Sequence, residues 1–200
     1  MPTMPTSNTI LFLGPDDSPL LQWLRESGET VVHTAERINH EFLQRHNIGF
    51  LVSFGYRHII KKDMLDLLPG RAINLHISLL PWNRGADPNL WSWVDNTPKG
   101  VTIHYLDEGV DTGDIIYQKE VLFDPAKETL ASSYATLQSE IVALFKAHWQ
   151  EIKSGACPRI PQRGVGSTHR VKDKEPLASI LNEGWDTSVS LLRKHHTISE

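Results

Sequence analysis

The sequence predicts an α/β fold in which a mostly parallel sheet is flanked by helices. From residue 9 to about residue 80, short apolar runs alternate with amphipathic stretches, an order that is typical of strand–helix–strand units. Two later apolar runs, at 100–107 and 113–123, are joined by a turn-rich segment, so we expect them to pair antiparallel. A chain of 200 residues with 40% apolar and 22% charged residues is suited to one folded domain.

The first half of the chain contains four predicted strands separated by three predicted helices. The apolar runs have the length of strands, and the third ends at Gly55. The amphipathic stretches have apolar residues at helical spacing, and the third is stopped by Pro69 and Gly70. The strands are expected at 9–14, 30–35, 48–55 and from 73 onward, and the helices at 18–27, 38–47 and 61–70.

The second half is expected to add two helices around the antiparallel strands, and then an irregular tail. One helix is predicted at 87–96, and a long periodic segment at 127–155 ends in a glycine, as a long helix should. Proline and glycine punctuate residues 155–174. We therefore expect residues 1–155 to form the core and residues 156–200 to form a short C-terminal extension, with no separate OB-type domain.

Composition and charge argue against several classes of function. The net charge is −4 and the basic residues are scattered, which disfavours nucleic acid as a partner. No apolar run approaches the roughly 20 residues of a membrane-spanning helix, and no basic segment precedes the first run, so neither a membrane nor a secretory role is predicted. The single cysteine, Cys157, permits no intrachain disulfide, and we expect a reducing, cytoplasmic location.

Metal and dinucleotide sites are not predicted either. None of the ten histidines lies in a dense Cys/His cluster or an HExxH motif. The first strand is not followed by a G-x-G-x-x-G sequence. Trp82, Trp91 and Trp93 are expected mainly in the core, but Trp91 and Trp93 cannot both face the core from one helix, so one of them is a candidate to face a ligand.

Polar side chains on one face of the fourth predicted strand are the main candidates for chemistry. Side chains alternate along a strand, so Asn74, His76 and Ser78 of the segment INLHISLLPWNRG point the same way. Ligands of open α/β sheets lie beyond the carboxyl ends of the strands. Three loops are expected at such ends: 53–58, 76–86 and 107–113.

Asp111, in the last of these loops, offers a partner for the histidine. A carboxylate near His76 would orient the imidazole and stabilise its charged form, and the Asn74 amide would donate to a developing oxyanion. Together they suit the addition of a nucleophile to a carbonyl group. The alternative is structural: a strand histidine packs in the core, and an aspartate in a glycine-rich loop caps a turn.

Two segments together resemble the folate-dependent formyltransferase family. They are INLHISLLPWNRG, at 73–85, and KGVTIHYLDEGVDTGDI, at 99–115. The family signature is an Asn-x-His strand, a Ser-Leu-Leu-Pro loop followed by Arg-Gly, and a downstream Asp-x-Gly-x-Asp-Thr-Gly loop. All parts occur in order, and the match is strongest over about 71–121.

The resemblance implies a Rossmann-like formyltransferase core, 10-formyltetrahydrofolate as the formyl donor, and no metal. It assigns catalysis to Asn74, His76 and Asp111. It also implies that the folate pteridine lies between the loops at 56–60 and 107–111. The residues expected to form this folate site are Tyr56, His58, Ile59, Ile60, Asp107 and Gly109.

Within the family, the variant at 81–104 is most similar to sugar-nucleotide N-formyltransferases and to the formylation domains of some peptide synthetases. The resemblance therefore implies that the acceptor is a primary amine of a nucleotide-linked amino sugar. The residues expected to contact it are Ser78, Asn83, Arg84 and Trp91. For Arg84 the alternative is a structural bridge from the loop to a carboxylate.

Other functions stay open at this point. A formyl-folate hydrolase would use the same site with water as acceptor, and another small amine is a further alternative acceptor. A non-catalytic folate- or nucleotide-binding module is also compatible with the fold, as is a homodimer. The acidic first loop, GPDDSP at 14–19, disfavours the phosphate of glycinamide ribonucleotide, and the length and net negative charge disfavour methionyl-tRNA as acceptor.

Overall fold

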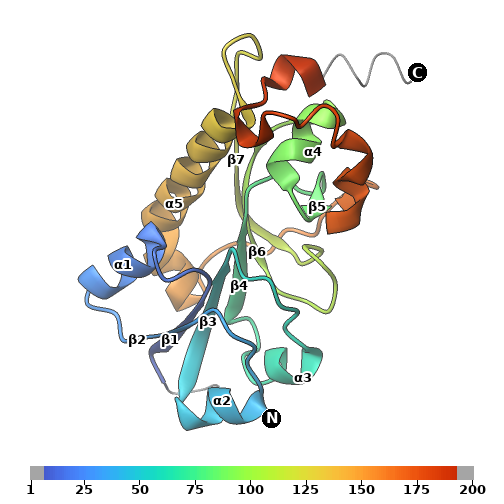
Figure 1. The fold of residues 1–200 in the computed structure, drawn as a ribbon. Helices are drawn as coiled ribbons and strands as arrows, with labels where there is room; N and C mark the ends of the chain where they lie inside the picture. Colours follow the sequence, from blue (N-terminus) through green and yellow to red (C-terminus); the bar gives the residue numbers. More distant parts are fainter. Residues whose placement is uncertain (1–6, 193–200) are drawn as a thin grey trace.

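The computed structural model describes residues 7–192 and confirms the mostly parallel sheet (Figure 1). Six strands lie in the order β2-β1-β3-β4-β6-β7; the first four are parallel, and β6 runs antiparallel to both β4 and β7. The predicted antiparallel pair is therefore confirmed as well. The strands are β1 (Thr9–Leu13), β2 (Val31–Thr34), β3 (Ile48–Phe54), β4 (Ala72–His76), β6 (Gly100–Tyr105) and β7 (Ile115–Glu120).

Each of the five segments predicted to be helical contains an α-helix. The longest, α5, begins with a capping box in which Thr129 and Ser132 each accept a backbone N–H bond, and it ends at Gly155, whose φ is 76°. Among residues 7–192, none of the helices has the length and apolar character needed to cross a bilayer. The helices are α1 (Pro19–Glu26), α2 (His40–Arg45), α3 (Lys62–Leu65), α4 (Pro88–Val94) and α5 (Leu130–Ser154).

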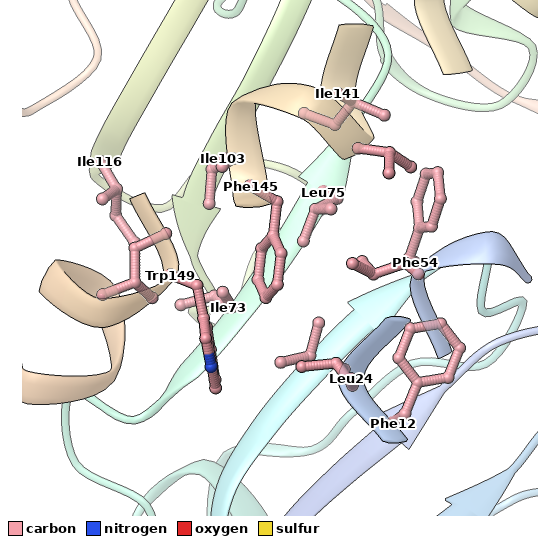
Figure 2. Close-up of a cluster of buried hydrophobic side chains, with 14 of the residues drawn as sticks. Phe12, Leu24, Phe54, Ile73, Leu75, Ile103, Ile116, Ile141, Phe145 and Trp149 are labelled. Carbon is pink, nitrogen blue, oxygen red and sulfur yellow. The ribbon is translucent and has the colours of Figure 1, made fainter. Parts of the chain in front are cut away.

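The main core fills the space between the sheet and helices α1 and α5 (Figure 2). Phe145 and Trp149 of α5 are almost fully buried there, together with Ile73 and Leu75 of β4. Burial of each such side chain contributes roughly 1.5–3 kcal/mol to folding. A second apolar cluster, with residues from α2 and α3, covers the other face of the sheet. The two faces of β4 are therefore distinct, and only one of them lies in the main core.

The chain after α5 returns to α4 and packs against it. β8 (Thr168–His169) pairs in parallel with β5 (Arg84–Gly85) to form a separate two-stranded sheet. Two 3₁₀ helices follow, at Val171–Leu177 and Gly184–Asp186, and a third apolar cluster joins this segment to α4 and α5. Helix α5 ends at Ser154, and the division of the chain after residue 155 stays a prediction; residues 193–200 of the expected extension lie outside the described residues.

Both tryptophans of α4 are buried, so the expectation that only one of them can be is wrong. Trp91 is 7% exposed and Trp93 is 1% exposed. Trp93 packs toward α5, where its Nε1 donates to Ser133 Oγ, and Trp91 stacks on His169 of β8 with 4.0 Å between ring centroids. The helix is covered on two sides because the C-terminal segment folds back over it, which the helical period of α4 alone does not reveal.

Candidate active site

Asn74 and His76 lie at the carboxyl end of β4 and point away from the main core. Their neighbours Ile73 and Leu75 are packed beside α5 (Figure 2), so the alternation of strand side chains directs the amide and the imidazole to the opposite face. Asp111 lies in the loop between β6 and β7 with a left-handed φ of 54°. The loop leaves β6 beside the start of β4, because Tyr105 pairs with Ile73, so the expectation that it lies at the carboxyl end of the parallel strands is wrong. It reaches back along β4 and brings Asp111 to Asn74 and His76.

The three residues predicted to be catalytic meet in one cluster. Asn74 Nδ2 donates to Asp111 Oδ1 over 3.1 Å, and His76 Nδ1 lies 3.5 Å from Asp111 Oδ2. The backbone N–H of Gly85 donates to the same Oδ2 over 2.9 Å. The turn of this loop is capped by a different carboxylate, Asp107, which accepts from the Gly109 N–H. Asp111 is thus directed at the strand residues and not at its own turn.

His76 is held between two acceptors. Its Nε2 lies 2.8 Å from the carbonyl oxygen of Asn83, while its Nδ1 faces the carboxylate of Asp111. A neutral imidazole has one N–H, whereas the imidazolium has two. The neutral ring can donate to one of these oxygens and a protonated ring to both, so the two acceptors hold the imidazole in one orientation.

A second histidine, His104 of β6, belongs to the cluster and was missed in the sequence. Its Nε2 lies 3.2 Å from Asn74 Nδ2 and 3.4 Å from Asp111 Oδ1, and its Nδ1 lies 2.8 Å from the Tyr105 carbonyl oxygen. A neutral ring with its proton on Nδ1 donates to that carbonyl and accepts from Asn74. The two N–H groups of Asn74 are then directed at Asp111 and His104.

The carboxylate of Asp111 is stabilised in its charged form. Burial by itself raises the pKa of Asp111, but the proximity of His76 and His104 and the Gly85 N–H outweigh that effect and hold the pKa well below its usual range. The site therefore contains a buried anion at neutral pH. Among the residues that the structure describes, no group of three or more His, Cys, Asp or Glu side chains is arranged to hold a metal ion.

Two residues predicted to contact the acceptor are buried inside the loop after β4. Ser78 Oγ donates to the Trp82 carbonyl over 2.7 Å. Asn83 is 0% exposed; its amide donates to Thr97 Oγ1 and accepts from Ser167 Oγ. The polar groups of Ser78 and Asn83 hold the loop in place, so neither side chain faces an open cleft.

Arg84 and Trp91, the other two predicted acceptor contacts, face the C-terminal segment. Arg84 donates from Nε and Nη2 to the amide oxygen of Gln162, over 3.1 and 2.7 Å. The structural bridge considered for Arg84 thus ends on an amide and not on a carboxylate. Trp91 is stacked on His169, and its indole N–H has no hydrogen-bond partner among the described residues.

The first loop predicted to hold folate contains both exposed and buried side chains. Tyr56 and His58 pack edge to face with 5.2 Å between ring centroids. Ile59 is 78% exposed, whereas the side chain of Ile60 is buried in the second core cluster. Of the two isoleucines, Ile59 is therefore the one that can contact a ligand with its side chain, and Ile60 can do so only through its backbone.

The second folate loop lies close to the first. Lys62, just after the first loop, is 3.7 Å from Glu108 in the second. Asp107 accepts hydrogen bonds from the Gly109 N–H and the Thr112 hydroxyl, which fixes the turn. A side chain at Gly109 would place its Cβ 2.0 Å from Thr112 Oγ1, so glycine is required for this tight turn. The ends of the two loops thus lie close together.

A cavity of about 440 Å³ opens at the carboxyl ends of β1 and β3. Phe54 and Gly55 line it from β3, one strand away from β4, and Tyr134 and Gln138 line it from α5. Ser18 also lines the cavity, and its hydroxyl is buried with no hydrogen-bond partner among the described residues. The cavity therefore combines apolar walls with polar groups, as small-molecule sites do.

Comparison with solved structures gives close neighbours. The formyltransferase PseJ from Anoxybacillus kamchatkensis, in complex with UDP-4,6-dideoxy-4-formamido-L-AltNAc and tetrahydrofolate, is 44% identical, with a TM-score of 0.87 over 92% of this chain and 97% of that chain. A sugar N-formyltransferase from a Shewanella species is 21% identical, with a TM-score of 0.77 over 92% of this chain and 87% of that one, and shows the shared fold.

Comparison with curated proteins points to the same family. Methionyl-tRNA formyltransferase from Agathobacter rectalis is 34% identical over 139 residues, which is 69% of this chain but 44% of that protein. The chain thus spans less than half the length of this relative. The family model described as formyl transferase matches residues 17–147, which includes every member of the Asn74–His76–His104–Asp111 cluster. The chain belongs to the formyl transferase family.

Proposed function

We propose that the chain is an N-formyltransferase that moves a formyl group from 10-formyltetrahydrofolate to the primary amine of a nucleotide-linked amino sugar. The observation that carries the proposal is the buried contact of Asn74, His76 and Asp111 at the carboxyl end of β4. PseJ, which is 44% identical and matches nearly end to end, is bound to a formamido nucleotide sugar and to tetrahydrofolate. The cytoplasmic location and a homodimer remain predictions.

In the proposed reaction, a neutral amine attacks the formyl carbon of the donor. Asp111, charged at neutral pH, keeps His76 oriented through Nδ1 and accepts the ammonium proton directly or through a water molecule. Asn74 and the protonated His76 stabilise the oxyanion of the tetrahedral intermediate. Collapse of the intermediate breaks the bond to the folate nitrogen, which takes up the proton removed from the ammonium group and leaves as tetrahydrofolate.

Two hydrogen bonds of the cluster must exchange partners in this reaction. His76 Nε2 is directed at the Asn83 carbonyl, and the Asn74 amide is directed at Asp111 and His104. An oxyanion is a stronger acceptor than a carbonyl or a neutral imidazole nitrogen. We infer that the His76 N–H turns from the Asn83 carbonyl to the oxyanion, and that one Asn74 N–H turns from His104 to the oxyanion. The intermediate then lies between β4 and the loop after it.

The acceptor and the donor are proposed to approach from different sides. The cavity at the ends of β1 and β3 is large enough for part of a sugar nucleotide, and its unpartnered Ser18 hydroxyl offers a hydrogen bond. The loops at 56–60 and 107–111 offer the exposed Ile59 and backbone groups to a flat pteridine. The cluster at the end of β4 lies on the strand next to β3 and carries the reacting atoms.

The test is a screen of UDP- and dTDP-linked amino sugars with 10-formyltetrahydrofolate. We expect one acceptor to gain the mass of one formyl group while tetrahydrofolate is released in equal amount, and His76→Ala to abolish both signals. Folate release that does not depend on any amine would identify a hydrolase. Folate binding without turnover on any amine would overturn the proposal in favour of a binding module.

A further inference from the structure

Gln162, in the C-terminal segment after α5, connects the two loops that surround the Asp111 carboxylate. Its Nε2 donates to two carbonyl oxygens of the loop between β6 and β7, those of Asp111 and Gly113, over 2.8 and 2.9 Å. Its Oε1 accepts from Nε and Nη2 of Arg84, over 3.1 and 2.7 Å. Both hydrogens of the amide and its oxygen are therefore bonded to segments more than 45 residues away in the sequence.

The two loops joined by Gln162 supply the two sides of one hydrogen bond. Arg84 immediately precedes Gly85, whose N–H donates to Asp111 Oδ2 over 2.9 Å. Gly85 is itself fixed by its pairing with His169, and an added Cβ would lie 2.3 Å from the His169 carbonyl oxygen. Gln162 thus holds the main chain of Asp111 on one side and the residue before Gly85 on the other.

The backbone of Asp111 gives a reason for these hydrogen bonds of the Gln162 amide, which together we call the clamp. Asp111 has a φ of 54°, a left-handed conformation that a residue with a side chain adopts at some cost. Its carbonyl and that of Gly113 both point to Gln162, so the amide stabilises this shape of the loop. Without the clamp, the loop is free to relax and to move the carboxylate away from His76.

We propose that Gln162 is a positioning residue of the active site, which sets the Asp111 carboxylate against His76 and the Gly85 N–H by joining the two loops. The inference rests on the proposed formyl transfer, because a rate is one of its readouts. Gln162 touches no reacting atom in this assignment. Its substitution is therefore expected to lower the rate of the chemical step more than the affinity for the acceptor.

The side chain chemistry allows the two halves of the clamp to be separated. Gln162→Glu keeps the length and the acceptor for Arg84 but has no N–H for the two carbonyls, which then face a carboxylate. Gln162→Leu removes both halves. Arg163→Ala is the matched control, since Arg163 is the exposed neighbour of Gln162 on the same segment.

The experiment compares these variants with the unmodified chain in two ways. Steady-state formyl transfer gives kcat and the acceptor KM, and NMR-detected amide exchange reports the Gly85 N–H. We expect both Gln162 variants to lose roughly 10- to 100-fold in kcat, as misplacement of a catalytic group by about 1 Å does, with much smaller changes in KM. We expect Gly85 exchange to rise about tenfold, while exchange in β1 and β3 and all values for Arg163→Ala stay unchanged.

The outcomes separate the two proposals. A kcat within about twofold of the unmodified chain for Gln162→Glu, or unchanged exchange at Gly85, would overturn the positioning role. If Gln162→Leu does not fold, Gln162→Glu decides, because it retains the Arg84 contact. If the unmodified chain formylates no acceptor, the proposed function fails, and Gly85 exchange still tests whether Gln162 holds the loops together.

Discussion

The active-site cluster has two halves that the chain builds in different ways. Asn74 and His76 come from one strand, two residues apart, so strand alternation alone places them on one face. His104 and Gln162 come from a neighbouring strand and from the segment after α5, and they reach the cluster through strand register and loop packing. Asn74 and His76 are thus set locally, whereas Asp111 and the groups around it come from distant parts of the chain.

The largest expected effect on the rate comes from changing the half of the cluster that lies on β4, Asn74 and His76. His76→Ala removes the ring that faces Asp111 and should lower kcat for formyl transfer by roughly 10²- to 10⁴-fold, the range for a general acid–base group. The measurement is initial-rate kinetics with folate release, with far-UV circular dichroism to confirm folding. His40→Ala, an exposed histidine at the start of α2, is the control and should keep its rate. A near-normal rate for His76→Ala would remove the proposed mechanism.

A change in the half of the cluster that comes from other parts of the chain, such as His104, is expected to lower both the stability of the fold and the rate. His104→Leu keeps most of the volume of a side chain that is 1% exposed but leaves the Tyr105 carbonyl and one Asn74 N–H without their partner. Each unsatisfied buried group costs about 1–3 kcal/mol, so the free energy of unfolding should fall by at least that much. Urea denaturation measures this fall, and kcat should decrease less than in His76→Ala. Unchanged stability would show that His104 is not held as described.

The difference between the halves explains what the sequence could predict. Alternation of strand and helix patterns was enough for the parallel sheet, and the Asn-x-His spacing was enough for one face of β4. Asp111 was found because its loop carries a recognisable motif. His104 was missed because only the register of the β4–β6 pair, which sets Asn74 opposite His104, brings it into the cluster. The same register could have been inferred by pairing the two strands antiparallel in the sequence.

Gln162 and the buried tryptophans were beyond reach for a different reason. Gln162 lies in an irregular segment rich in proline and glycine, where no period predicts which way a side chain points. Trp91 is covered by His169, from a two-residue strand that no sequence pattern announces. Contacts of this kind depend on the path of the C-terminal segment over α4, which local propensities do not determine.

Acid titration provides a smaller effect that tests the buried anion shared by both halves. The folded-state pKa of Asp111 lies below its unfolded value of about 3.9, so its contribution to stability is complete above that value and is lost as the pH falls through the folded pKa. Asp111→Asn removes this contribution at every pH. The difference in unfolding free energy between the two proteins should therefore be constant above about pH 5 and shrink below about pH 4.

Urea denaturation of both proteins between pH 3 and pH 8 measures that difference. The other carboxylates titrate in both proteins, so their contribution cancels in the comparison. A difference that grows as the pH falls would contradict a pKa of Asp111 below its usual range.

The smallest expected effect compares the two tryptophans of α4, one facing α5 and one facing the C-terminal segment. Trp93→Phe removes the hydrogen bond from the indole N–H to Ser133 Oγ, whereas the Trp91 N–H has no partner among the described residues to lose. Trp91→Phe and Trp93→Phe delete the same atoms, so their cavity terms are similar. Each change also weakens one ring contact, the stacking of Trp91 on His169 or the approach of Lys99 Nζ to the Trp93 ring, which leaves the hydrogen bond as the main difference. Trp93→Phe should be more destabilising by about 0.5–1.5 kcal/mol. An equal loss of unfolding free energy in the two variants, measured by thermal or urea unfolding, would contradict this expectation. It would indicate that the Trp91 N–H has a partner in solution, such as an ordered water molecule between α4 and the C-terminal segment.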